Sequence, residues 1–329
     1  MNLYQQQASN RRWTWAVMAG FAAFLAFLGY GFDLFYLGIP YPVAGLVALI
    51  IGLVSVWHVY RYGDREVLGS VDALAMGPAM AAAVSDEQRL KLTQLQNVTE
   101  EMAIAAGIPR PRLYLIFDTD PNAFATGRGP GYASIAMTQG LLDALNREEL
   151  QGVVAHEMSH IRNYDIRLMT VVAGLVGAIT LLSDWVSRDR QSRVSPARSE
   201  SRDDKDGGGA AAVVFFIVWI IAIVLAPIIA QILAMMVSRR RESLADASGA
   251  ELTRNPEALA SALQKIEAAV APTQSIKRGV AHLCIADPLG RKMGLREGFW
   301  ADLLATHPPM TKRIAALRAM AYLPPAPAA

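Results

Sequence analysis

The residues best suited to chemistry form the run His156-Glu157-Met158-Ser159-His160. Residues four apart share one face of a helix, so the two imidazoles can converge on one metal ion while Glu157 points toward a water bound to it. Zinc lowers the pKa of such a water to about 7, and a neighbouring carboxylate can then act as general base. The run therefore predicts a zinc site for peptide hydrolysis, with His156 and His160 as metal ligands and Glu157 as the catalytic base.

The segment before this run carries the signals of a helix start. Asn146 is a favourable N-cap residue and Glu149 stands at the third position of a capping box, so we expect the helix to begin near Arg147. Spacing alone would produce a chance match in roughly one chain in a hundred of this length, and the helix context lowers that risk. An apolar face for this helix is supplied by Leu150, Val153 and Val154.

A catalytic zinc ion usually takes three protein ligands and leaves one position for water, so a third ligand must come from elsewhere. The metzincin pattern is not met, because Asn163 and Ile166 stand where Gly and His would be needed. Asp165 is too close in sequence to reach the ion freely and is better interpreted as a helix cap or a group that supports a ligand. The better candidate is Glu242, because Asp246 lies one turn later and can accept a hydrogen bond from a ligand imidazole. On spacing alone, an exposed helix with Arg–Glu pairs remains the alternative.

Several motifs together resemble those of the HtpX-type membrane metalloproteases, bacterial relatives of the CAAX prenyl proteases. The resemblance extends from the first apolar segment to about residue 318, while the tail 321–329 and a charged insert after residue 186 match no known pattern. It implies a gluzincin-type catalytic domain with Glu242 as third ligand, one zinc ion per chain, and a role in protein quality control and the stress response. The motifs are the run 156–160 and the segments 122–127, 138–142, 241–246 and 306–309, with Arg313 and Ile314.

The composition places part of the chain in a membrane. Of 329 residues, 53% are hydrophobic and only 18% are charged, which is too apolar for an ordinary soluble two-domain enzyme. Residues 13–32 form a charge-free run of twenty, enough to cross a hydrocarbon core of about 30 Å. Further apolar runs follow at 42–59, 168–183 and 210–237. We therefore expect about four apolar helices joined to an α+β zinc metalloprotease domain.

These runs divide the chain into four parts. Residues 1–60 are expected to form a transmembrane hairpin, and residues 166–237 a second apolar pair with a disordered charged loop at about 187–209. The catalytic domain is then split between residues 61–165 and 238–329. Since the chain must return from His160 to Glu242, the second pair crosses the membrane twice or not at all. Two crossings are favoured, and a re-entrant or protein-covered hairpin is the alternative.

The basic residues orient the hairpin. Arg11 and Arg12 precede the first apolar run, and Arg61 and Arg65 follow the second, which places both ends in the cytoplasm under the positive-inside rule. Only about 12 Å of helix would separate His160 from the next apolar run, so the zinc site should lie near the cytoplasmic face of a bacterial inner membrane. Membrane proteins or unfolded polypeptides are then the expected substrates. With a net charge of +2 and no basic stripe, nucleic-acid binding has no support.

The region before the zinc helix reads as a small α+β fold. A helix is expected at about 86–106, then strands at 113–117 and about 132–137, separated by a Gly-rich turn.

In such folds an edge strand beside the metal can bind the substrate backbone as a further strand. We expect residues 133–137 to form that edge, with residues 122–127 beside it, and the substrate-binding candidates are therefore Asn122, Ala123, Ala133, Ser134 and Ile135. Equally, both segments could merely complete the sheet.

Two residues near the C-terminus are further catalytic candidates. His307 lies in a Thr-His-Pro-Pro segment and Arg313 follows on an expected helix. Either side chain could stabilise the oxyanion of the tetrahedral intermediate. A structural capping role is the alternative for this segment.

The leading functional hypothesis is a zinc endopeptidase that degrades misfolded or damaged membrane proteins. A catalytically silent membrane scaffold is a second possibility, against which the intact Glu157 argues. A third is a CAAX-type processing peptidase, which is disfavoured because four apolar runs are too few for a large intramembrane chamber.

Overall fold

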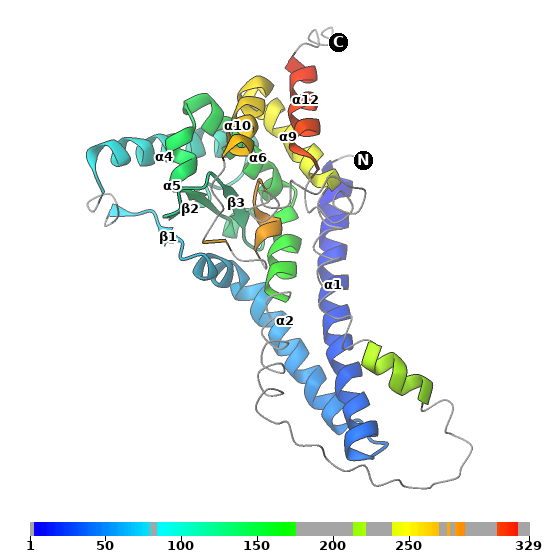
Figure 1. Cartoon of the computed structure of the whole chain (residues 1–329). Coiled ribbons are helices and arrows are strands. Elements are labelled where there is room, and N and C mark those ends of the chain that lie inside the picture. The colour runs from blue at the N-terminus through cyan, green and yellow to red at the C-terminus, as the bar shows by residue number, and fades with distance from the viewer. Residues whose placement is uncertain are drawn as a thin grey trace.

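The computed structural model describes residues 3–78, 80, 84–175, 213–221, 239–269, 275–276, 280–286 and 308–321. Figure 1 shows two long helices that extend from a head domain built of helices and one sheet. The head domain comprises the described residues between 74 and 162 and between 239 and 321.

The two long helices are α1 (Leu3–Phe32) and α2 (Val43–Ser70), and a π-helical turn, η1 (Asp33–Leu37), extends α1 toward the connection. The buried carboxylate of Asp33 closes this connection, because it accepts hydrogen bonds from the backbone N–H groups of Ala44 (2.8 Å) and Gly45 (2.9 Å) at the start of α2. Both helices are long and apolar enough to cross a membrane. Large apolar side chains stay exposed along α2, at Leu46, Val47, Ile50, Ile51, Leu53, Val54 and Trp57.

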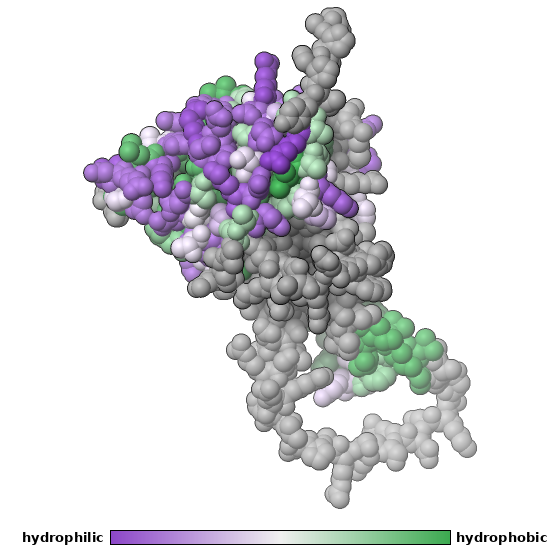
Figure 2. Space-filling model, turned by 45° about the horizontal axis from the view of Figure 1, so that its top comes forward, coloured by the Kyte–Doolittle hydropathy of each residue, from purple (hydrophilic) through white to green (hydrophobic). Residues whose placement is uncertain are grey.

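Two further helical segments pack against this hairpin. Residues 165–175 continue from the head domain and lie between α1 and α2, where Val171 and Leu175 join Met18 and Val59 in one buried cluster. The short helix 213–221 lies beside the far end of α1 in Figure 1 and contributes an exposed apolar patch in Figure 2. The rest of the apolar runs predicted at 168–183 and 210–237, and the charged loop predicted at 187–209, lies outside the described residues.

The head domain contains a four-stranded mixed sheet in the order β1-β2-β4-β3. The parallel pair is β2 (Arg112–Ile116) with β4 (Ser134–Thr138), and the strands predicted at 113–117 and 132–137 are thereby confirmed. Antiparallel partners flank this pair: β1 (Leu74–Ala75) joins β2, and β3 (Ala123–Thr126) joins β4. No strand was expected at β1, whereas β3 lies in the segment 122–127, for which completing the sheet was one of the two alternatives.

The prediction that residues 133–137 form a sheet edge is wrong. Because β4 pairs with β2 on one side and with β3 on the other, its backbone has no free side for a further strand. Ala133, Ser134 and Ile135 are all buried in this interior position. The edge strands of the described sheet are β1 and β3, and the Ala123 carbonyl of β3 accepts a hydrogen bond from the Ile285 N–H (2.9 Å).

The helices of the head domain pack around a central helix, α6, which contacts α4, α9, α10 and strand β3. The expected helix at 86–106 is confirmed as α4, which begins with a capping box at Ser85 and Gln88 and ends at Gly107 with φ +67°. The described architecture is therefore α+β, as expected. The helices are α4 (Asp86–Ala106), α5 (Gln139–Ala144), α6 (Arg147–Arg162), α9 (Arg239–Thr253), α10 (Pro256–Ala268) and α12 (Met310–Ala321).

Candidate metal centre

Helix α6 begins where the sequence predicted. The Asn146 side chain accepts a hydrogen bond from the Glu149 N–H (2.9 Å), and the Glu149 carboxylate accepts one from the Asn146 N–H (2.8 Å). Burial alone would raise the pKa of Glu149, but hydrogen bonds from Lys265, the Asn146 backbone and Ser261 outweigh it and lower the pKa. Since Ser261 and Lys265 belong to α10, this cap also ties the start of α6 to its neighbour.

Helix α9 approaches α6 very closely at one glycine. A Cβ added to Gly249 would lie 3.1 Å from the backbone nitrogen of His156, a tight contact, so a residue without a side chain allows this spacing without displacing either helix. The close approach brings Glu242, two turns earlier on α9, toward the histidines of α6.

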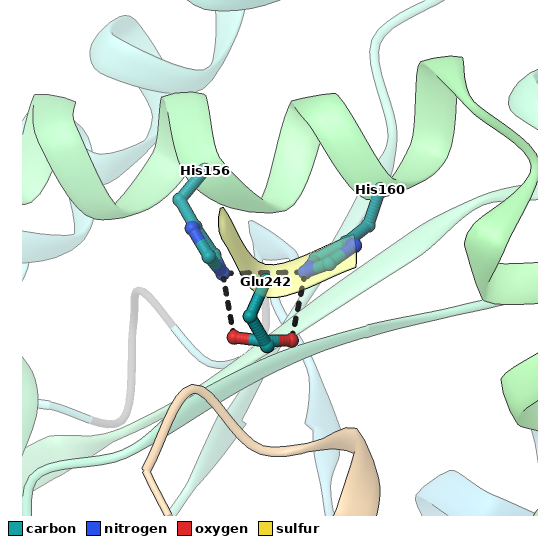
Figure 3. Close-up of side chains that lie close together, drawn as sticks. All are labelled: His156, His160 and Glu242. Carbon is teal, nitrogen blue, oxygen red and sulfur yellow. Dashed lines mark hydrogen bonds and ion pairs between the residues drawn. The ribbon is translucent and has the colours of Figure 1, made fainter. Parts of the chain in front are cut away.

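The side chains of His156, His160 and Glu242 point toward one another beside α6, as Figure 3 shows. The two Nε2 atoms are 3.2 Å apart, and the Glu242 oxygens lie 3.6 Å from His156 Nε2 and 3.4 Å from His160 Nε2. All three side chains are buried. Two ligand atoms each about 2.1 Å from a tetrahedral zinc ion would be about 3.4 Å apart, so this donor set fits zinc in both chemistry and spacing.

Each histidine is backed by a carboxylate. Asp246 Oδ1 lies 2.9 Å from His156 Nδ1, the position expected for it, and Asp165 Oδ2 lies 3.2 Å from His160 Nδ1. Burial alone would lower the pKa of His160, but hydrogen bonds with Asp165 and Glu242 raise it well above its ordinary value. Of the two interpretations open for Asp165, the contacts therefore favour support of a ligand. Carboxylates of this kind fix the orientation of an imidazole that binds a metal.

Arg313 lies in the site but makes contacts other than those expected. Its Nε and Nη2 donate to the two oxygens of Asp246 (2.8 and 2.7 Å), and its Nη1 donates to the Ile285 carbonyl (2.8 Å). The same Nη1 is 3.3 Å from Glu242 Oε2. Burial alone would raise the pKa of Asp246, but the guanidinium outweighs it and lowers the pKa to about 2. All three guanidinium nitrogens of Arg313 contact protein oxygens, which places Arg313 to hold the two carboxylates, while the oxyanion role stays a prediction.

Glu157 is buried beside the two histidines. Its two carboxylate oxygens accept no hydrogen bond from any residue in the described part of the chain, which is a costly state for a buried carboxylate unless a further group meets it. Burial raises the pKa of Glu157, and the positive charge of His156 and His160 only partly offsets this. A carboxylate that lies beside the candidate metal ligands and has a raised pKa is suited to accept a proton from water.

Two of the predicted substrate-binding residues, Asn122 and Ala123, contact the segment 285–286. Asn122 donates to the Ala286 carbonyl (3.1 Å) and accepts from the Ala123 N–H (3.0 Å), so Asn122 and Ala123 hold the segment that also bonds to Arg313. His307 lies outside the described residues. The sequence analysis did not identify Asn10 as a site residue, although its side chain donates to Asp165. No spacing pattern connects residues 155 positions apart.

Together, an apolar helical hairpin and a buried His-His-Glu cluster in an α+β domain define a membrane metalloprotease. The comparisons with known proteins agree, because the model of Peptidase family M48 matches residues 89–321. Two relatives named Protease HtpX homolog are each 40% identical to this chain. The one from Thermoanaerobacter pseudethanolicus aligns over 319 residues, covering 97% of this chain and 98% of the relative. The one from Streptococcus gordonii aligns over 320 residues, covering 97% and 100%.

The chain therefore belongs to Peptidase family M48, among its HtpX-type membrane metalloproteases. Among solved structures, the crystal structure of Ste24p from S. mikatae is similar with a TM-score of 0.49 and 16% sequence identity. That match covers 95% of this chain and 67% of Ste24p.

Proposed function

We propose that this chain is a zinc-dependent endopeptidase of the gluzincin type that cleaves misfolded or damaged membrane proteins. The observation that carries the proposal is the convergence of His156, His160 and Glu242, with the buried Glu157 carboxylate beside them. His156, His160 and Glu242 would hold one zinc ion. Family membership supports the protease activity, and the donor set supports the metal.

The residues of the chain divide the chemistry between them. Bound zinc supplies the positive charge that lowers the pKa of a water and polarises a peptide carbonyl. Glu157 takes the proton from the attacking water at a carboxylate oxygen and passes it to the nitrogen of the leaving amine. Asp246 and Asp165 orient the two imidazoles, and Arg313 holds Asp246 and Glu242 in place.

The position of the site supports membrane proteins as substrates. Asn10, at the start of α1, contacts Asp165, so the metal centre stands directly at one end of the apolar hairpin. Arg11, Arg12, Arg61 and Arg65 are exposed at this same end, which by the positive-inside rule faces the cytoplasm. A site at this level can receive cytoplasmic loops and tails of membrane proteins, as well as unfolded polypeptides at the membrane surface.

We also propose that the second apolar pair crosses the membrane twice. The Trp219 indole donates to the Leu28 carbonyl (3.0 Å), and Leu28 lies about 27 Å along α1 from Asn10 at 1.5 Å per residue. By residue 241 the chain has returned, because Arg241 Nε is 3.4 Å from Asp165. A path from the level of Asn10 to the level of Leu28 and back supports two crossings, with the active site on the cytoplasmic side of the bacterial inner membrane.

Cleavage by the purified protein tests the proposed activity. The full chain in detergent is incubated with an unfolded membrane protein, with added zinc and with zinc plus a chelator. We expect cleavage that needs zinc and stops with the chelator. Absence of cleavage in the presence of bound zinc would instead favour the silent scaffold, and cleavage unaffected by chelation would overturn the metal mechanism.

Thiol labelling tests the two crossings. Single cysteines replace Ser192 or Ser201 in a Cys284→Ser background, and intact cells are treated with a membrane-impermeant thiol reagent. Two crossings predict labelling from outside the cell. Labelling that appears only after lysis would place both helices on the cytoplasmic side.

A further inference from the structure

The carboxylate of Asp165 joins three parts of the chain. Its Oδ2 faces His160 Nδ1 at 3.2 Å, while its Oδ1 accepts a hydrogen bond from Asn10 Nδ2 (2.6 Å) and lies 3.4 Å from Arg241 Nε. His160 belongs to α6 and Arg241 to α9, the two helices that carry the metal ligands. Asn10 belongs to α1, the first membrane helix, and is separated from Asp165 by 155 residues. Asp165 is fully buried, and these protein contacts hold its carboxylate in place.

We propose that Asn10 is a positioning residue for the metal centre: it fixes the Asp165 carboxylate, and through it the His160 imidazole. The first membrane helix is then part of the support of the active site as well as an anchor. This inference rests on the proposed function, since it concerns how His160 is held for the zinc ion.

Asn10 makes a polar contact where packing alone would favour an apolar side chain. Its side chain is fully buried, and Nδ2 donates both to Asp165 and to the Asn163 carbonyl (2.8 Å). Its Oδ1 is also buried and has no hydrogen-bond partner in the part of the chain that the structure describes. Burying an amide oxygen unpaired is unfavourable. The two donated bonds, one of them to a charged group, are what offsets that cost.

A second amide on α1 allows the positioning of Asp165 to be distinguished from the docking of α1 on the head domain. Gln7, one turn earlier, donates from Nε2 to the Arg162 carbonyl (2.9 Å), so both amides meet carbonyl groups at the C-terminal end of α6. Only Asn10 also reaches the carboxylate behind His160. Figure 1 shows the N-terminus of α1 beside the head domain, with the remainder of the helix extending away from it. Gln7→Ala therefore weakens docking without touching Asp165, which makes it the matched control.

The zinc dissociation constant of the full chain in detergent, measured by competition with a fluorescent chelator, is the readout. Asp165→Asn should weaken zinc binding by about 10- to 100-fold, as changes to groups behind metal ligands do. We expect Asn10→Ala to weaken it by about tenfold, at the lower end of this range, because it acts through Asp165. Gln7→Ala should bind zinc as the unchanged protein does.

A double variant tests whether Asn10 acts through Asp165. If it does, adding Asn10→Ala to Asp165→Asn causes no further loss of zinc affinity, whereas independent effects would multiply. Multiplying effects, or equal losses in Asn10→Ala and Gln7→Ala, would overturn the inference and leave a docking role only.

The thermal midpoint of the metal-free protein checks folding. If Asn10→Ala fails to fold, the isosteric Asn10→Asp replaces it; its carboxylate repels Asp165, so it should lower zinc affinity at least as much. Unchanged zinc affinity in a folded Asn10 variant overturns the inference. Failure of the unchanged protein to bind zinc would instead overturn the proposed function.

Discussion

Replacing Arg313 with methionine should strongly destabilise the metal-free head domain. The guanidinium is buried and neutralises the carboxylates of Asp246 and Glu242, which are buried as well. Removing one partner from such a group leaves an uncompensated charge and costs about 3–5 kcal/mol. The pKa of Asp246 provides an independent magnitude, because it falls from 3.8 to about 2 against the opposing effect of burial. At about 1.4 kcal/mol per pKa unit, this corresponds to about 2–3 kcal/mol.

The pH dependence has a definite sign. Because the pKa of Asp246 is lowered in the folded state, its contribution is fully present above pH 4 or so and is lost as the pH falls toward 2. The difference in stability between the unchanged protein and Arg313→Met should therefore be largest near neutral pH.

Thermal unfolding of the metal-free protein in detergent measures this difference. For a domain of roughly this size each kcal/mol shifts Tm by about 2–4 °C, so we expect Arg313→Met to lower it by roughly 6–20 °C. Arg318→Met is the matched control on the same helix, because Arg318 pairs with Glu257 (3.2 Å) while both side chains are nearly half exposed. Such a pair contributes about 0–1 kcal/mol. Similar small shifts for both variants, with only turnover lost in Arg313→Met, would refute the positioning role and restore the oxyanion hypothesis.

Three further outcomes follow from the site. Glu242→Ala should lose bound zinc while Glu251→Ala, an exposed change on the same helix, keeps it; equal zinc content would remove Glu242 from the site. Asp246→Asn should weaken zinc affinity by about 10- to 100-fold, measured by chelator competition, and no change would contradict its contact with the imidazole. Gly249→Ala should cost about 1–3 kcal/mol in thermal unfolding and lower zinc affinity, because the added Cβ pushes α9 from α6. Gly69→Ala, whose added Cβ would meet open space, should lower neither the thermal stability nor the zinc affinity.

The sequence predicted the parts of the site that depend on local spacing. The start of α6 at Asn146 and Glu149 was foreseen because capping signals lie within one turn of the helix they begin. The position of Asp246 beside an imidazole followed from its place one turn after Glu242. The first prediction needed only the geometry of a single helix, whereas the second also depended on the resemblance, which implies Glu242 as third ligand.

The features that the sequence could not provide depend on pairing between distant segments. The sequence of a single strand does not show which strands it pairs with. For this reason β4 was assigned to an edge, whereas it lies between β2 and β3. The two-residue strand β1 is too short to carry a periodic pattern. Asn10 and Arg313 contribute through contacts with groups 155 and 67 residues away, for which the chain offers no spacing rule.

Zinc content and proteolysis of Glu157→Gln, measured on the same preparation, show whether Glu157 is the general base of a zinc peptidase. The substitution leaves His156, His160 and Glu242 untouched but removes the carboxylate that accepts the proton. We predict zinc bound at the level of the unchanged protein, together with loss of cleavage of an unfolded membrane protein. Cleavage at the rate of the unchanged protein would show that Glu157 is not the general base.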